Sequence, residues 1–279
     1  MQQALRSALG GGVAGGLAMF VNVGALMWLR TTVNYQYRYG MSTTDALRHL
    51  YREGGIPRFY KGVGPALLQG PLSRFGDTAA NAGMLTLLES YDSTRTLPVW
   101  LKTAFASVAA GGFRIILMPI DTCKTVMQVE GSAGMAVLRA KMATSGPTVL
   151  FSGAMGAATA TLVGHYPWFF VNNTLQETLP QYDRKTQLPA YLMRNAAIGF
   201  CASAVSDTIS NSIRVLKTTK QSSPTAISYR QAAQLVIDKD GVNGLFLRGL
   251  KTKIFANGAQ GMLFSVLWRL GQDMLATPR

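Results

Sequence analysis

One short segment of the sequence contains a proline, which can bend a helix, and two residues of opposite charge: Pro119, Asp121 and Lys124. The acid and the base stand three residues apart, which places them on the same face of a helix. Proline bends a helix because it lacks an amide hydrogen and crowds the turn before it. Charge pairs in a partly hydrated site are strong enough to hold helices together and weak enough to separate again. We therefore expect this segment to join neighbouring helices reversibly.

The basic residue of this segment, Lys124, has a counterpart in two other parts of the sequence. A basic residue followed by threonine recurs about every 93 residues, as Arg30-Thr31, Lys124-Thr125 and Lys217-Thr218. About 30 residues further on, each copy has a second segment that ends in a glycine: Gly62, Gly153 and Gly249. Similarity at a fixed period is typical of proteins built from repeated units. The sequence predicts three repeats, over residues 1–94, 95–187 and 188–279.

Six stretches have the length and apolar character of membrane helices, with scattered polar residues in each: 8–30, 63–88, 100–123, 153–177, 190–216 and 250–275. Only 14% of the 279 residues are charged, whereas soluble domains usually have about a quarter. Polar residues are tolerated inside a bilayer where they face a bundle interior or a hydrated cavity. We therefore predict an all-α membrane protein with six transmembrane helices in three pseudo-symmetric repeats.

Each pair of long helices encloses a more polar segment with the pattern of a short amphipathic helix. Ser42 and Asp45 resemble an N-cap with an acid three residues on, and the pattern recurs over residues 133–144 and 228–240. The predicted repeat is therefore two long helices plus one short surface helix. The segments on the other side, 88–102 and 177–194, are predicted to be simple loops.

Charge predicts the orientation of the bundle. The three segments that hold the surface helices contain 16 of the 27 Lys and Arg residues and five acids. The loops 89–102 and 177–194 contain five basic and four acidic residues. The positive-inside rule places the surface helices in the inner compartment, and an even number of helices returns both termini to the other side.

The composition argues against other classes of protein. The net charge of +14 lies in short islands between apolar stretches, not on one basic face, so we expect no nucleic-acid partner. Cys123 and Cys201 give neither a disulfide framework nor zinc spacing. The glycine run 10–16 has no strand before it and suits helix packing, not dinucleotide binding. No arrangement of nucleophile, base and acid is present, and we expect no enzyme activity, metal or cofactor.

The two repeated segments, the first with its basic residue and the second with its landmark glycine (Gly62, Gly153 or Gly249), resemble the repeats of the mitochondrial carrier family over essentially the whole chain. The segment from Pro119 to Lys124 matches the Pro-x-Asp/Glu-x-x-Lys/Arg motif of that family, and residues 53–62 match its second motif. The resemblance implies a multi-pass protein of the mitochondrial inner membrane, with both termini toward the intermembrane space, that works by alternating access. It also implies a gate on the matrix side, built from Arg30, Pro119, Asp121, Lys124, Arg214 and Lys217.

The gate motif is complete in the second repeat alone. Met27 and Arg214 stand where the first and third repeats of the family have an acid. In the family each acid pairs with the base of the next repeat. Asp121 is therefore expected to pair with Lys217, whereas Arg214 would face Arg30. The acid positions of the family's opposite gate are also uncharged here: Asn81, Asn172 and Trp268.

The resemblance places substrate contacts seven or eight residues past each landmark glycine, at Gln69, Thr161 and Asn257. Further polar candidates inside the predicted helices are Arg74, Asp77, Arg114, His165, Asp207 and Gln260. Arg114 and Asp207 occupy equivalent positions and could pair, as a substrate site or as a static salt bridge. The resemblance also implies cardiolipin binding at the glycine-containing segments: Gly54, Gly55, Tyr60, Lys61, Gly62, Gly146, Gly153, Gly241, Arg248 and Gly249.

Two functions stay open at this point. Excess positive charge around the predicted gate favours transport of a small anionic metabolite. The incomplete gates favour instead a transport-impaired protein that serves as an accessory subunit of a respiratory or ATP-synthase assembly. In that case the aromatic residues Trp168, Phe169 and Phe170, predicted to face lipid, would form a surface for protein partners.

Overall fold

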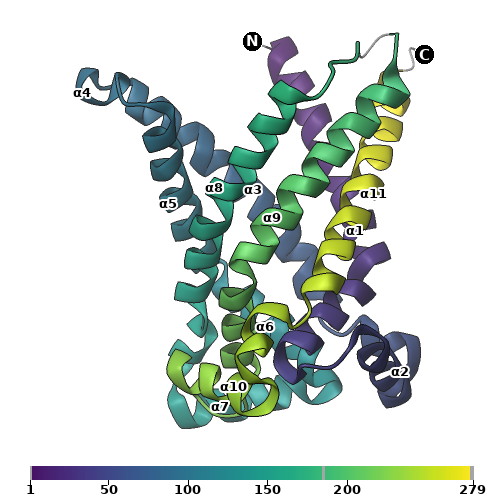
Figure 1. The fold of residues 1–279 in the computed structure, drawn as a ribbon, viewed down its shortest axis with the longest axis vertical. Coiled ribbons are helices and arrows are strands. Elements are labelled where there is room, and N and C mark those ends of the chain that lie inside the picture. The colour runs from purple at the N-terminus through teal and green to yellow at the C-terminus, as the bar shows by residue number, and fades with distance from the viewer. Residues whose placement is uncertain (1, 184–185, 277–279) are drawn as a thin grey trace.

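The computed structural model describes residues 2–183 and 186–276, and all regular secondary structure in these residues is helical. The long helices run along the longest axis of the molecule (Figure 1): α1 (Gln2–Tyr39), α3 (Val63–Glu89), α5 (Val99–Ile116) with α6 (Met118–Glu130), α8 (Ala154–Thr178), α9 (Leu188–Ser222) and α11 (Leu250–Ala276). Three shorter helices gather at one end of the molecule: α2 (Thr43–Phe59), α7 (Gly134–Ser145) and α10 (Tyr229–Leu247). Helix α1 begins and helix α11 ends at the opposite end.

The helix positions agree with those predicted from the sequence, with two differences. Helices α1, α6 and α9 continue to Tyr39, Glu130 and Ser222, beyond the predicted ends at 30, 123 and 216. The segment 88–102 is not a simple loop, because it contains the one-turn helix α4 (Asp92–Arg95). Two 3₁₀ turns, η1 (Gly131–Ala133) and η2 (Pro147–Phe151), flank α7.

Side-chain caps fix where two of the short helices begin. The Ser42 hydroxyl accepts a hydrogen bond from the Asp45 amide at 3.2 Å at the start of α2. Ser228 and Gln231 form a reciprocal capping box at the start of α10. Both caps satisfy amide groups that have no partner inside the helix. The cap predicted from Ser42 and Asp45 is confirmed.

The predicted proline bend occurs where the proline is present. Helix α5 ends at Ile116, helix α6 begins at Met118, and the two meet at an angle of 65°. Pro119 lies in the first turn of α6, where a missing amide hydrogen costs no hydrogen bond. Helices α1 and α9 are continuous through Ala25 and Ser212, the equivalent positions without proline.

Each short helix is fastened to the end of a long helix from another part of the chain by one buried cation. We call Arg58, Lys141 and Arg248 the clamp residues. Their side chains are 3%, 2% and 6% exposed. Each donates hydrogen bonds to backbone carbonyl groups at a helix C-terminus, which otherwise have no partner.

The three clamps follow one another around the bundle. Arg58, from α2, donates to the carbonyl groups of Gln128 and Val129 at the end of α6, at 2.9 and 2.7 Å. Lys141, from α7, donates to three carbonyl groups at the end of α9: those of Lys220, Gln221 and Ser223. Arg248, just after α10, donates to those of Tyr37 and Arg38 at the end of α1. Together the clamps join the three parts of the chain in a closed ring.

The landmark glycines allow this close packing. Gly62, Gly153 and Gly249 have φ values of 84°, 90° and 64°, a region that side chains other than glycine rarely adopt. A Cβ atom at Gly62 would lie 2.9 Å from the carbonyl oxygen of Lys124 on α6. Glycine therefore serves both the turn into the long helix and the approach of its neighbour.

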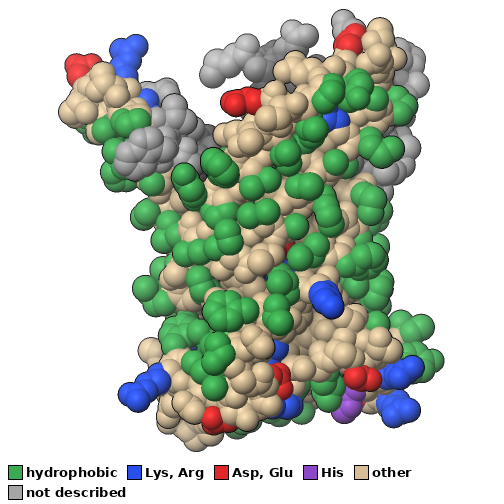
Figure 2. Space-filling view, viewed as in Figure 1, with side chains coloured by type: hydrophobic (Ala, Val, Ile, Leu, Met, Phe, Trp, Pro, Cys, Tyr) green, Lys and Arg blue, Asp and Glu red, His purple; other side chains and the backbone are tan. Residues whose placement is uncertain are grey.

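The surface of the molecule is apolar along much of its length. Figure 2 shows hydrophobic side chains over the middle of one face, with charged groups mostly toward its two ends. Among the described residues, one helical stretch, Pro147–Thr178, is by itself long and apolar enough to cross a membrane. The bent pair Ala104–Ile116 and Met118–Ser145 also qualifies when taken as one span. The six transmembrane helices predicted from the sequence stay a prediction.

Candidate functional site

The long helices surround a polar cavity of about 780 Å³. Its charged lining, in the described part of the chain, consists of six cations and two acids: Arg30, Arg114, Lys124, Arg214, Lys217, Lys253, Asp121 and Asp207. The cavity therefore has a strong excess of positive charge. We call the level at which Asp121, Lys124, Lys217, Arg30 and Arg214 lie the cavity floor.

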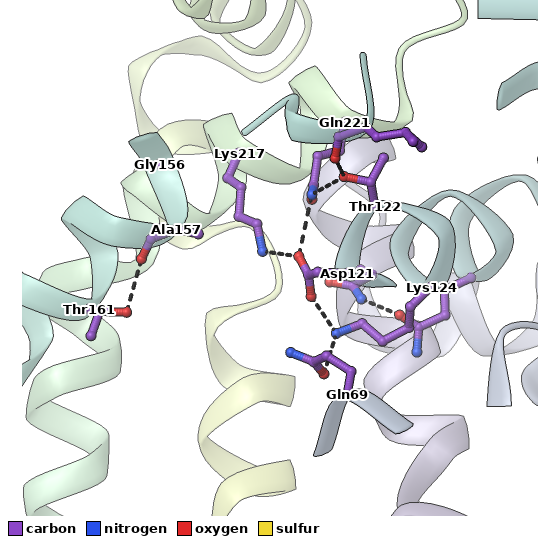
Figure 3. A network of polar contacts seen from close by, with 12 residues as sticks. Gln69, Asp121, Thr122, Lys124, Gly156, Ala157, Thr161, Lys217 and Gln221 are labelled. Carbon is purple, nitrogen blue, oxygen red and sulfur yellow. Dashed lines mark hydrogen bonds and ion pairs between the residues drawn. The ribbon is translucent and has the colours of Figure 1, made fainter. Parts of the chain in front are cut away.

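Asp121 joins two helices at the floor (Figure 3). One carboxylate oxygen contacts the Lys217 ammonium of α9 at 2.5 Å, and the other contacts Lys124 of its own helix at 2.7 Å. The structure thus brings together Asp121 and Lys217, the pair expected from the repeat pattern. Their role as a gate stays a prediction.

Neutral side chains complete this joint. The Gln221 amide donates to Asp121 at 3.3 Å and to the hydroxyl of Thr122 at 3.2 Å. Lys124 also donates to the carbonyl oxygen of the Gln69 side chain at 3.1 Å. Gln69, predicted as a substrate contact, is therefore tied to the floor through Lys124.

The joint between α1 and α6 is uncharged. The Asn34 amide donates to the side-chain oxygen of Gln128 at 2.5 Å. Gln128 in turn donates to the sulfur of Met27 at 3.6 Å, where the family motif would place an acid. A weak acceptor thus takes the place of an ion pair at this joint, and the described contacts at the floor between these two helices are neutral hydrogen bonds.

The joint between α9 and α1 has cations on both helices. Arg30 donates to the side-chain oxygen of Gln260 on α11 at 2.7 Å and to that of Asn22 at 3.3 Å. Arg214 contacts Asp207 of its own helix at 3.8 Å and donates to Ser210 at 3.1 Å. Each guanidinium therefore has partners other than the opposing arginine that the repeat pattern placed before it.

Most of the predicted substrate contacts line the cavity: Gln69, Arg114, Thr161, His165, Asp207, Asn257 and Gln260. The Thr161 hydroxyl donates to the carbonyl group of Ala157 in its own helix at 2.9 Å. His165 shares a hydrogen bond of 2.9 Å with Ser107 through Nδ1. The side chains of Arg74 and Asp77 lie outside the described residues, as do those of Asn81 and Trp268.

The predicted pair of Arg114 and Asp207 stays a prediction. Both residues line the cavity, and the contacts of Asp207 in the described part of the chain are with Arg214 and Asn257. The Asn257 amide donates to the Asp207 carboxylate, which places this acid between α9 and α11.

Two interpretations from the sequence need correction. Trp168 and Phe169 line the cavity, so they do not form the outward surface that their apolar character suggested, whereas Phe170 is 61% exposed. The side chain of Arg248, one of the predicted lipid contacts, is buried against α1 and pairs with Asp240 at 2.7 Å.

Sequence reasoning missed Lys253, which lines the cavity from α11 and donates to Asn257 at 3.1 Å. It lies one turn before the position at which substrate contacts were sought. The available signal was its charge near the start of a mostly apolar helix, where an ionisable residue is by default a functional candidate.

The comparison with known families gives one result for this chain. The family model described as mitochondrial carrier protein matches residues 2–91. That segment contains α1, α2 and α3 and supplies Arg30 and Gln69 to the cavity. No curated protein matches the sequence.

Proposed function

We propose that the chain is a member of the mitochondrial carrier family, whose model matches residues 2–91, and that it moves a small anionic metabolite across the mitochondrial inner membrane by alternating access. Proteins of this family are inner-membrane metabolite transporters and not enzymes. The proposal includes six transmembrane helices in three repeats. The short helices α2, α7 and α10 lie on the matrix side, and both termini face the intermembrane space.

The charge of the cavity is the observation that carries this proposal. Six cationic and two acidic side chains line it in the part that the structure describes. Cations that surround a hydrated cavity raise the local concentration of anions. A neutral or cationic solute would gain nothing from this lining, so an anion is the favoured substrate.

The joint at Asp121 gives the proposed transporter its gate. The Asp121–Lys217 contact closes the floor between α6 and α9, and opening toward the matrix requires this contact to break. An ion pair that is 9% and 19% exposed regains water when it separates, which lowers the cost of opening.

The clamp ring supports the repeat architecture. A cation after or within each short helix reaches the C-terminal carbonyl groups of the long helix that belongs to the next part of the ring. For the inner-membrane setting we also propose cardiolipin as a lipid partner. The glycine-containing turns at Gly62, Gly153 and Gly249 leave backbone groups near the ends of long helices, where anionic headgroups bind.

Exchange in liposomes tests the proposal. The purified chain is reconstituted with a panel of unlabelled anions inside and the labelled anion outside, with neutral and cationic metabolites in parallel. We expect exchange of at least one anion, lowered about tenfold or more by Asp121→Asn, since a separated gate cannot close. Asp238→Asn, on the exposed face of α10, is the matched control and should leave exchange unchanged.

The opposite outcome is also informative. Absence of exchange across the panel, together with purification in a fixed ratio with a respiratory or ATP-synthase complex, would overturn transport in favour of the accessory-subunit function.

A further inference from the structure

Each short helix is followed by a segment that leads back to a long helix and has a left-handed glycine at both ends. The glycines that begin these segments have φ values of 63°, 77° and 68°: Gly55, Gly146 and Gly241. The landmark glycines, also at positive φ, end them. Residues other than glycine rarely adopt this conformation, so the chain changes direction at both ends of each segment. We call residues 55–62, 146–153 and 241–249 the return segments.

The exposed side chains of α10 change character at Gly241. Before this glycine, the helix exposes charged side chains: Arg230, Asp238 and Lys239. After it, three apolar side chains are each more than half exposed: Val242, Phe246 and Leu247. Asn243 is the one polar side chain that this return segment exposes. The surface thus passes from charged to uncharged at the glycine.

The same change occurs at the other two short helices. Helix α2 exposes charged side chains before Gly55, among them Arg52 and Glu53, whereas the residues exposed after it are Ile56 and Pro57. The return segment 146–153 contains no charged residue at all, and it exposes Phe151. All three return segments therefore present an uncharged outer face.

The cations of the return segments lie on the inner side. Arg58 and Arg248 are clamp residues, and each is buried against the end of a neighbouring long helix. Lys61, at the end of its return segment, is half-buried. A segment that contains a cation is thus held by the protein on one face and is apolar on the other.

The outer face of the return segments continues onto the surface of the long helices. Near the start of those helices, three apolar side chains are each more than half exposed: Leu68 on α3, Met155 on α8 and Phe255 on α11. The helical stretch that is long enough and apolar enough to cross a membrane, Pro147–Thr178, begins inside the second return segment. Return segment and long helix therefore form one apolar surface, and the cover that suits the long helix, lipid, suits both.

We propose that the return segments enter the bilayer and that lipid acyl chains cover their outer faces, whereas the charged parts of the short helices stay in water. Amphipathic segments of this kind insert about 5–10 Å into the boundary between headgroups and acyl chains. The long side chain of Lys61 lets its charge reach the headgroups from there. The inference rests on the membrane setting of the proposed function and does not depend on transport.

Quenching of a fluorescent label tests the depth of one return segment. The full chain with Cys123→Ala, Cys201→Ala and Val242→Cys is labelled and reconstituted in phosphatidylcholine liposomes, with iodide supplied on both sides of the membrane. We expect lipids brominated on their acyl chains to quench the label and iodide to leave it unchanged. Asp238→Cys, exposed on the same helix before Gly241, is the matched control and should be quenched by iodide. The depth of the two labels should differ by about 5–10 Å.

Ile56→Cys and Phe151→Cys extend the measurement to the other two return segments, and both labels should behave as at Val242. The unaltered chain gives a second test if the cysteine-free background does not fold. A lipid-soluble carbene reagent is activated in liposomes that contain this chain, and the modified residues are mapped by mass spectrometry. We expect modification within 242–247 and none within 230–239, and the reverse distribution would overturn the inference.

A label on a long helix separates this inference from the membrane setting. Phe255→Cys on α11 should be quenched by the brominated lipid. Iodide quenching at Val242 together with lipid quenching at Phe255 overturns the lipid contact of the return segments while the membrane setting stands. Iodide quenching at both overturns the membrane setting as well.

Protection of the Val242 label from both quenchers would mean that protein covers the return segment, which also overturns lipid as its partner. Lipid quenching at Val242, in a chain that exchanges no metabolite, keeps the inference and overturns transport.

Discussion

The clamp ring and the cavity floor lie at the same end of the molecule and are built by different rules. The clamp ring has three similar joints, in each of which one buried cation binds the carbonyl groups of a helix end. The floor has three unlike joints: an ion pair at Asp121, a neutral contact at Gln128, and the place between α9 and α1 where Arg214 contacts Asp207 and Arg30 contacts Gln260.

The difference separates the residues that hold the fold from those that set its chemistry. Backbone carbonyl groups are present whatever the sequence of the long helices, so a clamp survives changes in the side chains of its partner helix. A floor ion pair needs a specific acid and a specific base. The floor could therefore lose two of its acids while the helices stayed in place.

Breaking a clamp should have the largest effect. Arg248→Met leaves Asp240 without its partner and the carbonyl groups of Tyr37 and Arg38 without donors. We expect a loss of about 4 kcal/mol in the free energy of unfolding, seen as a fall in Tm of about 10 °C.

A milder variant and an exposed control show whether the loss comes from the clamp. Asp240→Asn keeps the arginine and its carbonyl bonds, so it should cost about 1 kcal/mol and gives a measurable protein if Arg248→Met does not fold. Arg230→Met, an exposed control on the same helix, should leave Tm unchanged. A loss of equal size in the control would contradict the clamp.

A matched pair of changes compares two joints of the floor. Lys217→Gln removes a cation that contacts Asp121 at 2.5 Å, whereas Arg214→Gln removes one that contacts Asp207 at 3.8 Å. We expect the first change to cost about 2 kcal/mol and the second less than about 0.5 kcal/mol. Thermal unfolding of the two variants side by side is the measurement, and equal losses would refute the difference between the joints.

Exchanging the charges of Asp121 and Lys217 tests whether the two residues are energetically coupled. Asp121→Lys combined with Lys217→Asp should recover more stability than the sum of the single changes allows, by about 1 kcal/mol. Strict additivity would show that the two residues are not coupled.

The last prediction is a pH dependence at Lys141, the clamp residue that has no acid partner among the described residues, whereas Arg58 contacts Glu53 and Arg248 contacts Asp240. Burial, together with the charges of Lys220 and Arg38, lowers the pKa of Lys141 to about 8 from 10.5. Between these values the unfolded chain binds more protons than the folded chain, so the contribution of Lys141 to stability rises with pH. We expect a slope of up to about 1.4 kcal/mol per pH unit between pH 8 and 10.5.

Unfolding at several pH values, with Lys141→Met for comparison, measures this slope. The variant should lack the part of the slope that depends on Lys141, and an identical slope in both proteins would contradict it.

The sequence predicted the elements well because their signals are local. The N-cap at Ser42 and the bend at Pro119 each depend on a few adjacent residues. The Asp121–Lys217 contact was expected from the family resemblance, which implies that the acid of one repeat pairs with the base of the next.

The parts that were missed depend on packing between distant segments. Lys141 occurs in no motif, and its carbonyl partners on α9 lie about 80 residues away. Lys253 lies four residues after Gly249, and only the packing of α1 and α9 beside α11 shows that it lines the cavity near Arg30 and Arg214. Trp168 has the composition of a lipid-facing residue, and its helix turns it toward the cavity.

The closed order of the clamps constrains how the protein can move. Each long helix that ends at the floor is held by a short helix that is covalently followed by a different long helix. If one floor helix tilts outward while the clamps hold, it pulls the next short helix with it, and that helix displaces its own long helix in turn. We therefore expect the three floor helices to move together and not one at a time.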